Sequence, residues 1–138
     1  MIAPVLCLMH VANPNLLELS ARPWLYELGV QRLSDVPDSV LEGFVAKGID
    51  SIYLLGVWEL GEYGVAMDKA NIDNYRSTLP DITEDDVIGS CFAVVDYTMN
   101  EKEIGTNSDL RKFRERLHKL GLMLYLDFVP NHSAVDAV

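Results

Sequence analysis

The chain has 138 residues, 49% of them hydrophobic and 23% charged, so it can bury a sizeable core and does not have the composition of a disordered protein. Its formal net charge of −10 argues against nucleic-acid binding and against attachment to an anionic membrane surface. No run of residues approaches the roughly 18 apolar positions of a membrane span.

The apolar amino-terminal stretch does not resemble a secretory signal peptide. No Lys or Arg precedes its apolar run, and no small-residue cleavage site follows it. Cys7 and Cys91 are the only cysteines. Two thiols form no disulfide framework and cannot alone fill a zinc site. We therefore expect reduced thiols in a cytoplasmic protein.

The first third of the chain predicts one strand and one helix. Residues 15–28 indicate a short strand followed by a turn at Pro23. Residues 33–48 place their apolar side chains on one helical face. Pro37 suits the first turn of this helix, and Gly48 suits its end.

A second strand and a long excursion follow. Residues 49–58 are a continuous apolar run rich in β-branched and aromatic side chains, which is typical of a parallel strand covered on both faces. Residues 58–105 show several turn signals and little periodicity. They carry too many aromatic side chains for disorder, so we expect an ordered excursion over one end of the sheet.

The clearest helix covers residues 106–121. Its apolar stripe consists of Leu110, Phe113, Leu117 and Leu120. Thr106 and Asp109 form a capping-box pattern, and Gly121 is placed to end the helix. The apolar residues 122–129 predict a further strand. Helices that alternate with buried parallel strands indicate an α/β fold.

Polar side chains lie at the end of that last strand. Asp127, Asn131 and His132 occupy the position where α/β folds bind ligands. They are compatible with a ligand cleft in which His132 donates a hydrogen bond. The residues alone favour a plainer interpretation, in which Asp127 caps backbone amides and Asn131 and His132 lie in an exposed turn after Pro130. A metal site is a weaker interpretation, because the spacing matches no compact metal motif.

The segment "DFVPNH" resembles the D-x-V-x-N-H segment of the α-amylase family of glycoside hydrolases. Other segments agree in order. "NLLELSARPWLYEL" is similar to the family's first barrel strand, and "GIDSIYLLGVW" to its second. "GSCFAVVDY" looks like its aromatic substrate loop, and the helix at residues 106–121 like the one that leads into the third strand. The resemblance covers residues 15–135.

This resemblance implies a partial (β/α)₈ TIM barrel, with the first three strands, their helices and a long loop after the second strand. Residues 1–138 would then be the amino-terminal portion of a catalytic barrel. The implied activity is hydrolysis or transfer at α-glucosidic bonds with retention, and the implied partner is an α-glucan or α-glucoside.

The same resemblance implies roles for individual residues. Phe92 falls where the family has a tyrosine that stacks on the sugar, so a ring face is kept and a hydroxyl is lost. His132 would hydrogen-bond that sugar, and Asp127 would hold an arginine of the next strand. Asn131 would lie where calcium-binding members place a calcium ligand. Asp96, followed by Tyr97, would brace the substrate loop.

Retaining glycosidases need two carboxyl groups roughly 5–5.5 Å apart. The resemblance places these at the ends of later strands, so we expect a truncated chain that is inactive alone. We also expect self-association through uncovered strand edges. Two alternatives remain open at this point. One is a non-catalytic carbohydrate-binding or interaction remnant, and the other is a small complete α/β hydrolase that uses Asp127 and His132.

Overall fold

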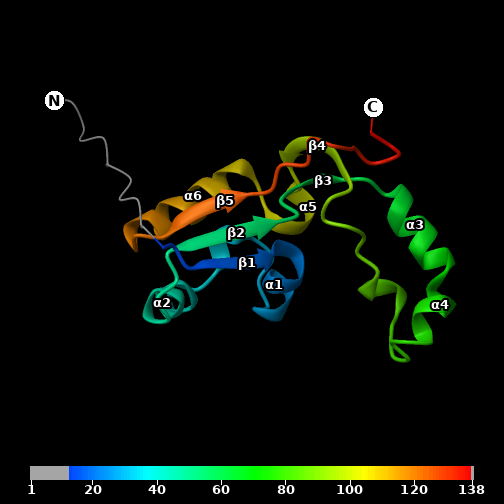
Figure 1. The fold of residues 1–138 in the computed structure, drawn as a ribbon, viewed down its shortest axis with the longest axis horizontal. Coiled ribbons are helices and arrows are strands. Elements are labelled where there is room, and N and C mark those ends of the chain that lie inside the picture. Colours follow the sequence, from blue (N-terminus) through cyan, green and yellow to red (C-terminus); the bar gives the residue numbers. More distant parts are fainter. Residues whose placement is uncertain (1–12, 138) are drawn as a thin grey trace.

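The computed structural model describes residues 13–137 and has an α/β fold. Strands β1 (Leu16–Ser20), β2 (Ser51–Leu55) and β5 (Met123–Leu126) form a parallel sheet in the order β1-β2-β5 (Figure 1). The predicted α/β class with parallel strands is therefore confirmed. Closure of the sheet into a barrel stays a prediction.

Three helices pack on one face of this sheet: α1 (Ala21–Glu27), α2 (Asp38–Ala46) and α6 (Asn107–Lys119) (Figure 1). The turn η1 (Leu33–Asp35) joins the first two. The core contains Trp24, Leu25, Leu41, Ile52, Leu54, Phe113 and Leu117. Because strand side chains alternate between faces, Ile52 and Leu54 point into this core.

The opposite face of the sheet is open in the part of the chain that the structure describes. Leu16 at its edge is 51% exposed, and Tyr125 on β5 is 47% exposed. Tyr125 lies beside Tyr53 in the register of β2 and β5. Within the described residues, the parallel sheet and its helices thus form two layers, with helices on one face of the sheet only.

The excursion after β2 is ordered and contains a second sheet. Strands β3 (Trp58–Leu60) and β4 (Val94–Met99) pair antiparallel. Short helices fill the rest of it: α3 (Tyr63–Ala70), α4 (Ile72–Arg76), η2 (Glu84–Asp86) and α5 (Glu101–Ile104). The expectation of an ordered excursion is confirmed, whereas its description as a loop is incomplete, because Asp96 and Tyr97 lie within β4.

Two further boundaries differ from the sequence predictions. The turn predicted at Pro23 is wrong, because Pro23 lies in the first turn of α1. Proline is tolerated there, because N–H groups in the first turn make no hydrogen bond within the helix. The apolar run at 49–58 does not stay one strand. Gly56 adopts a φ of +74°, and a Cβ there would lie 2.9 Å from Cys91 Cβ, so the chain turns from β2 to β3 at this glycine.

The cap of α6 follows the sequence prediction. Thr106 and Asp109 form both halves of the capping box, and Gly121 adopts a φ of +79° just after the helix. A capping box is local to four residues, so the pattern alone identifies it.

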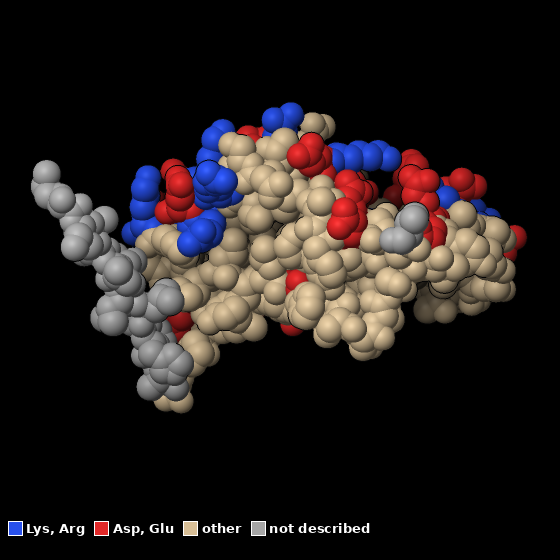
Figure 2. All heavy atoms as spheres, turned by 90° about the horizontal axis from the view of Figure 1, so that it is seen from above, with Lys and Arg blue, Asp and Glu red and all other residues tan. Residues whose placement is uncertain are grey.

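Charge is distributed unevenly along the molecule. Figure 2 shows Lys and Arg gathered toward the end where α6 lies, and Asp and Glu more frequent toward the end with α3. The strands of the parallel sheet point toward this second end (Figure 1). Cys7 and the apolar amino-terminal stretch lie outside the described residues. Among residues 13–137, no helix has the length and apolarity to cross a bilayer.

Candidate functional site

Asp127 follows β5 at the carboxyl edge of the sheet and is only 2% exposed. Its Oδ2 atom accepts a hydrogen bond of 3.3 Å from the backbone N–H of Gly56 at the end of β2. Its Oδ1 atom is buried and has no hydrogen-bond partner within the described residues. Burial raises the pKa of this carboxyl above its ordinary value. A buried carboxylate with one unpaired oxygen lowers the stability of the fold, and that oxygen can accept a hydrogen bond from another group.

An aromatic cluster covers the same edge. We use this name for Trp58, Tyr97 and Phe128. Tyr97 contacts both others, with ring centroids 5.4 Å from Trp58 and 5.3 Å from Phe128. Trp58 Nε1 donates to the backbone oxygen of Asp127 at 2.8 Å. The backbone N–H of Val129 donates to the Tyr97 hydroxyl at 2.8 Å. These contacts fasten the β3–β4 pair to the segment after β5.

Phe92 and His132 lie on two segments that meet in the structure. The Phe92 side chain is 41% exposed, and His132 is exposed. The backbone N–H of Ala134 donates to the carbonyl of Val94 at 2.9 Å, so residues just after Phe92 and just after His132 are hydrogen-bonded to each other. Whether both side chains face one ligand stays a prediction.

The segment after His132 is held at its far end by Asp136. Its Oδ2 atom accepts from the backbone N–H groups of Glu62 at 2.7 Å and Tyr63 at 3.0 Å, at the start of α3. These hydrogen bonds, first that from Tyr63, lower the pKa of the Asp136 carboxyl. Gly61 is needed here, because a Cβ at this position would overlap Asp136 Oδ1 and lie 2.8 Å from Ala134 Cβ.

Asp96 contributes to the surface near this contact. It accepts a hydrogen bond of 3.3 Å from Thr98 Oγ1 on its own strand. It also lines a cavity of about 620 Å³ together with Leu60, Gly61, Glu62, Val95 and Asp136. Asp96 is thus exposed beside this cavity, and its role in bracing the substrate loop stays a prediction.

The described residues do not by themselves form a complete calcium site. Asn131 is exposed, and residues 13–137 contain no cluster of three His, Cys, Asp or Glu side chains with the geometry of a metal site. Calcium needs six to eight oxygen ligands, and a single exposed amide supplies one of them. The role of Asn131 as a calcium ligand stays a prediction.

Several residues that build this edge were not found from the sequence. Gly56 carries a signal, because a lone glycine inside an apolar strand run indicates a close approach or a turn. Asp136 and the contact of Ala134 with Val94 carry no local signal, because their partners are 40 or more residues away. Trp58 is visible as an aromatic residue, but its bond to the Asp127 carbonyl is a tertiary feature.

Fold and site together define an α/β protein with a carboxylate, an aromatic cluster and an exposed histidine at the carboxyl edge of a parallel sheet. No protein-family model and no curated protein sequence matches the chain. Among solved structures, it is similar to a noncanonic maltogenic α-amylase from Thermotoga neapolitana, with 25% identity and a TM-score of 0.62. The similarity covers 94% of this chain and 26% of the amylase.

A second similar structure is trehalose-6-phosphate hydrolase from Bacillus licheniformis, with 16% identity and a TM-score of 0.54. It covers 87% of this chain and 17% of the hydrolase, and it bears on the fold alone. The chain thus spans about a quarter of the first protein and a smaller share of the second. The similarity to the maltogenic α-amylase supports the resemblance that "DFVPNH" indicated.

Proposed function

We propose that this chain forms the first three strands of the catalytic barrel of a glycoside hydrolase or transglycosidase that acts on α-glucosidic bonds. The observation that carries the proposal is the carboxyl edge of the sheet, where Asp127, Phe92 and His132 follow the ends of β2 and β5 directly or through ordered segments. The similarity to a maltogenic α-amylase over 94% of the chain supports the same reading.

Each proposed site residue has chemistry suited to a sugar. The exposed ring of Phe92 offers an apolar face to pyranose C–H groups. His132 offers an imidazole that donates to a hydroxyl. Asp127 has a buried oxygen without a partner among the described residues, and this oxygen can accept from a cationic or amide partner. In the full-length enzyme, we propose that this partner is an arginine of the following strand.

The surface charge favours a neutral ligand. The net charge is −10, and acidic side chains are frequent at the end toward which the strands point (Figure 2). A field of that sign repels an anionic sugar phosphate and leaves a neutral glucan unaffected. We therefore propose a neutral α-glucan or α-glucoside as substrate.

The reacting carboxylates belong, in this proposal, to later strands of the full-length protein. Retention requires a nucleophile and an acid/base on opposite sides of the scissile bond. The chain described here contributes sugar binding and orientation, so binding can be tested without turnover.

The test is an NMR titration of the chain with maltotriose. We expect weak, saturable binding that Phe92→Ala weakens roughly fivefold to tenfold through loss of stacking, and that His132→Ala weakens through loss of one hydrogen bond. Tyr26→Ala and His118→Ala are matched controls. Tyr26 is 87% exposed on α1, and His118 lies in the last turn of α6. Equal losses in the controls, or no saturable binding by the parent chain, would contradict the proposal.

A further inference from the structure

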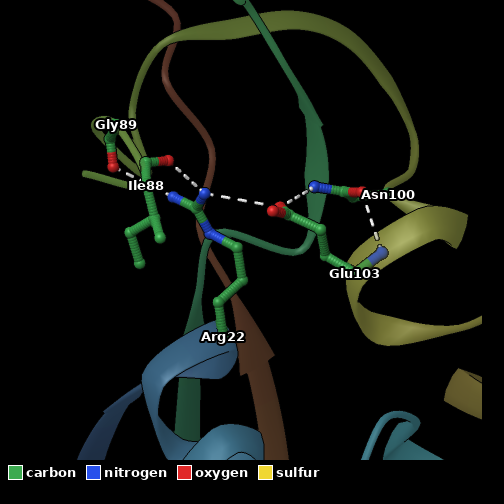
Figure 3. A network of polar contacts seen from close by, with 5 residues as sticks. All are labelled: Arg22, Ile88, Gly89, Asn100 and Glu103. Atoms are coloured by element: carbon green, nitrogen blue, oxygen red, sulfur yellow. Dashed lines mark hydrogen bonds and ion pairs between the residues drawn. The ribbon is translucent and has the colours of Figure 1, made fainter. Parts of the chain in front are cut away.

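Arg22 is a nearly buried cation at the start of α1, with its side chain 9% exposed. Its guanidinium donates to two consecutive backbone carbonyls, those of Ile88 and of Gly89, the latter at 3.0 Å. The same guanidinium forms an ion pair of 3.3 Å with Glu103 Oε2 (Figure 3). One arginine thus joins three parts of the chain that are far apart in sequence.

The acidic partner of Arg22 is itself fixed. Asn100 Nδ2 donates to Glu103 Oε2 at 2.7 Å, and the backbone N–H of Glu103 donates to Asn100 Oδ1 at 3.3 Å (Figure 3). The backbone N–H of Asn100 in turn donates to the carbonyl of Val57, just after β2, at 3.0 Å. The ion pair is therefore anchored to the carboxyl edge of the sheet.

The segment held by Arg22 leads directly to Phe92. We call residues 88–93 the Phe92 loop. Its internal hydrogen bonds come from Ser90, which accepts from the backbone N–H groups of Phe92 through Oγ and of Ala93 through its carbonyl. These bonds shape the loop but do not attach it to the sheet. The carbonyl of Ala93 accepts from the backbone N–H of Gly61 at 2.8 Å, which attaches the last residue of the loop to the β3–β4 pair. The rest of the loop is attached by Arg22 and by the close approach of Cys91 to Gly56.

We propose that Arg22 is a positioning residue that holds the Phe92 loop at the carboxyl edge of the sheet and thereby sets the place of the Phe92 ring. The sugar-binding consequence rests on the proposed function, whereas the attachment of the loop does not. A planar guanidinium can bind two carbonyls and a carboxylate at once, which a lysine ammonium on its flexible stem cannot reproduce in the same geometry.

Cys91 lies in the Phe92 loop, so the reaction rate of its thiol measures whether the loop stays attached to the sheet. Cys91 is half-buried, and its Cα and Cβ approach Gly56 closely, so a thiol reagent reaches the thiol more readily when the loop leaves the sheet. Burial and then Asp127 raise the pKa of the Cys91 thiol, whereas Arg22 lowers it. Loss of the Arg22 charge alone would therefore slow the reaction of Cys91. Release of the loop would speed it, so the two effects have opposite signs.

The experiment measures the reaction of Cys91 with an aromatic disulfide in the full chain carrying Cys7→Ser. We expect Arg22→Met to raise the rate about tenfold or more, because hydrogen bonds from a charged donor are stronger than neutral ones. Arg22→Lys should give an intermediate rate, since one contact can be restored. If circular dichroism shows that Arg22→Met does not fold, the rate in Arg22→Lys is the test. A faster Cys91 reaction than in the parent chain then supports the proposal, and an unchanged or slower one contradicts it.

Arg116→Met is the matched control. Arg116 also donates to two carbonyls, those of Ser34 and Val36, and pairs with Asp38, but it lies on α6 away from the Phe92 loop. We expect it to leave the Cys91 rate unchanged while global stability falls. An unchanged or slower Cys91 reaction in Arg22→Met, or an equal rise in Arg116→Met, overturns the proposal.

Binding of maltotriose separates the positioning role from the proposed function. A faster Cys91 reaction together with weaker maltotriose binding in Arg22→Met supports both. A faster Cys91 reaction in a chain whose parent binds no maltotriose supports the positioning role and refutes the sugar site. Unchanged Cys91 reactivity refutes the positioning role, whatever the result with the sugar.

Discussion

Replacement of Asp127 by Asn should stabilise the chain at neutral pH. The carboxyl is 2% exposed. Within residues 13–137, one of its oxygens has no hydrogen-bond partner, and the other accepts a bond of 3.3 Å from the Gly56 N–H. An unsatisfied buried polar atom costs about 1–3 kcal/mol, and more when the group is charged. Asn keeps an oxygen for the Gly56 N–H and places its amide nitrogen at the unpaired position, so the gain comes from removal of the buried charge. We expect a gain of about 1–2 kcal/mol at pH 7.

The gain should depend on pH in a direction that the pKa fixes. Burial raises the pKa of Asp127 in the folded chain, so the folded state binds its proton more tightly than the unfolded state does. The contribution of Asp127 to the free energy of unfolding is therefore fully present below the pKa of the unfolded chain. It is lost as the pH rises through the pKa of the folded chain. The advantage of Asp127→Asn should therefore be largest near pH 7 and vanish below the ordinary pKa of an aspartate.

The assay is urea unfolding of both chains between pH 3.5 and 7.5, followed by tryptophan fluorescence. Asp96→Asn is the control, because Asp96 is exposed and its replacement should change stability by less than about 0.5 kcal/mol. A less stable Asp127→Asn chain at pH 7, or a difference that is constant over the whole pH range, would refute the reasoning about the buried carboxylate.

Four further outcomes follow from particular contacts. Asp109→Asn should lower the free energy of unfolding by about 2 kcal/mol at pH 7. The reason is that hydrogen bonds from Thr106, and then from Ser34, hold the pKa of this buried carboxyl at about 2. In urea titrations, the difference between variant and parent should shrink as the pH falls from 3.8 toward 2. Gly61→Ala should expose the Ala134 amide to hydrogen exchange by displacing Asp136, whereas Gly43→Ala, with open space around it in α2, should not. The purified chain should not hydrolyse an aryl α-glucoside, and turnover that persists after repurification would contradict this. Sedimentation should detect self-association through the sheet face and the edges of β1 and β5 that residues 13–137 leave uncovered, and a strictly monomeric chain at high concentration would count against it.

The sequence by itself determined the features that depend on neighbours along the chain. The apolar stripe of α6, its capping box at Thr106 and Asp109, and its end at Gly121 all rest on contacts within a few residues. The parallel strands β2 and β5 are likewise visible as continuous apolar runs. Pro23 is the exception, because proline is compatible with both a turn and a first helical turn, and only the packing of α1 on β1 selects the helix.

Only the tertiary structure decided how the carboxyl edge is built. The antiparallel pairing of β3 with β4 joins segments more than 30 residues apart, and neither has a strong periodic signal. Burial of Asp127, its bond to Gly56 and the clamp of Arg22 on the Phe92 loop depend on partners 66 to 71 residues away. A sequence pattern records the chemical type of such a side chain. The partner it meets is set by the path of the chain through the fold, because hydrogen bonds and burial depend on distance in space and not along the sequence.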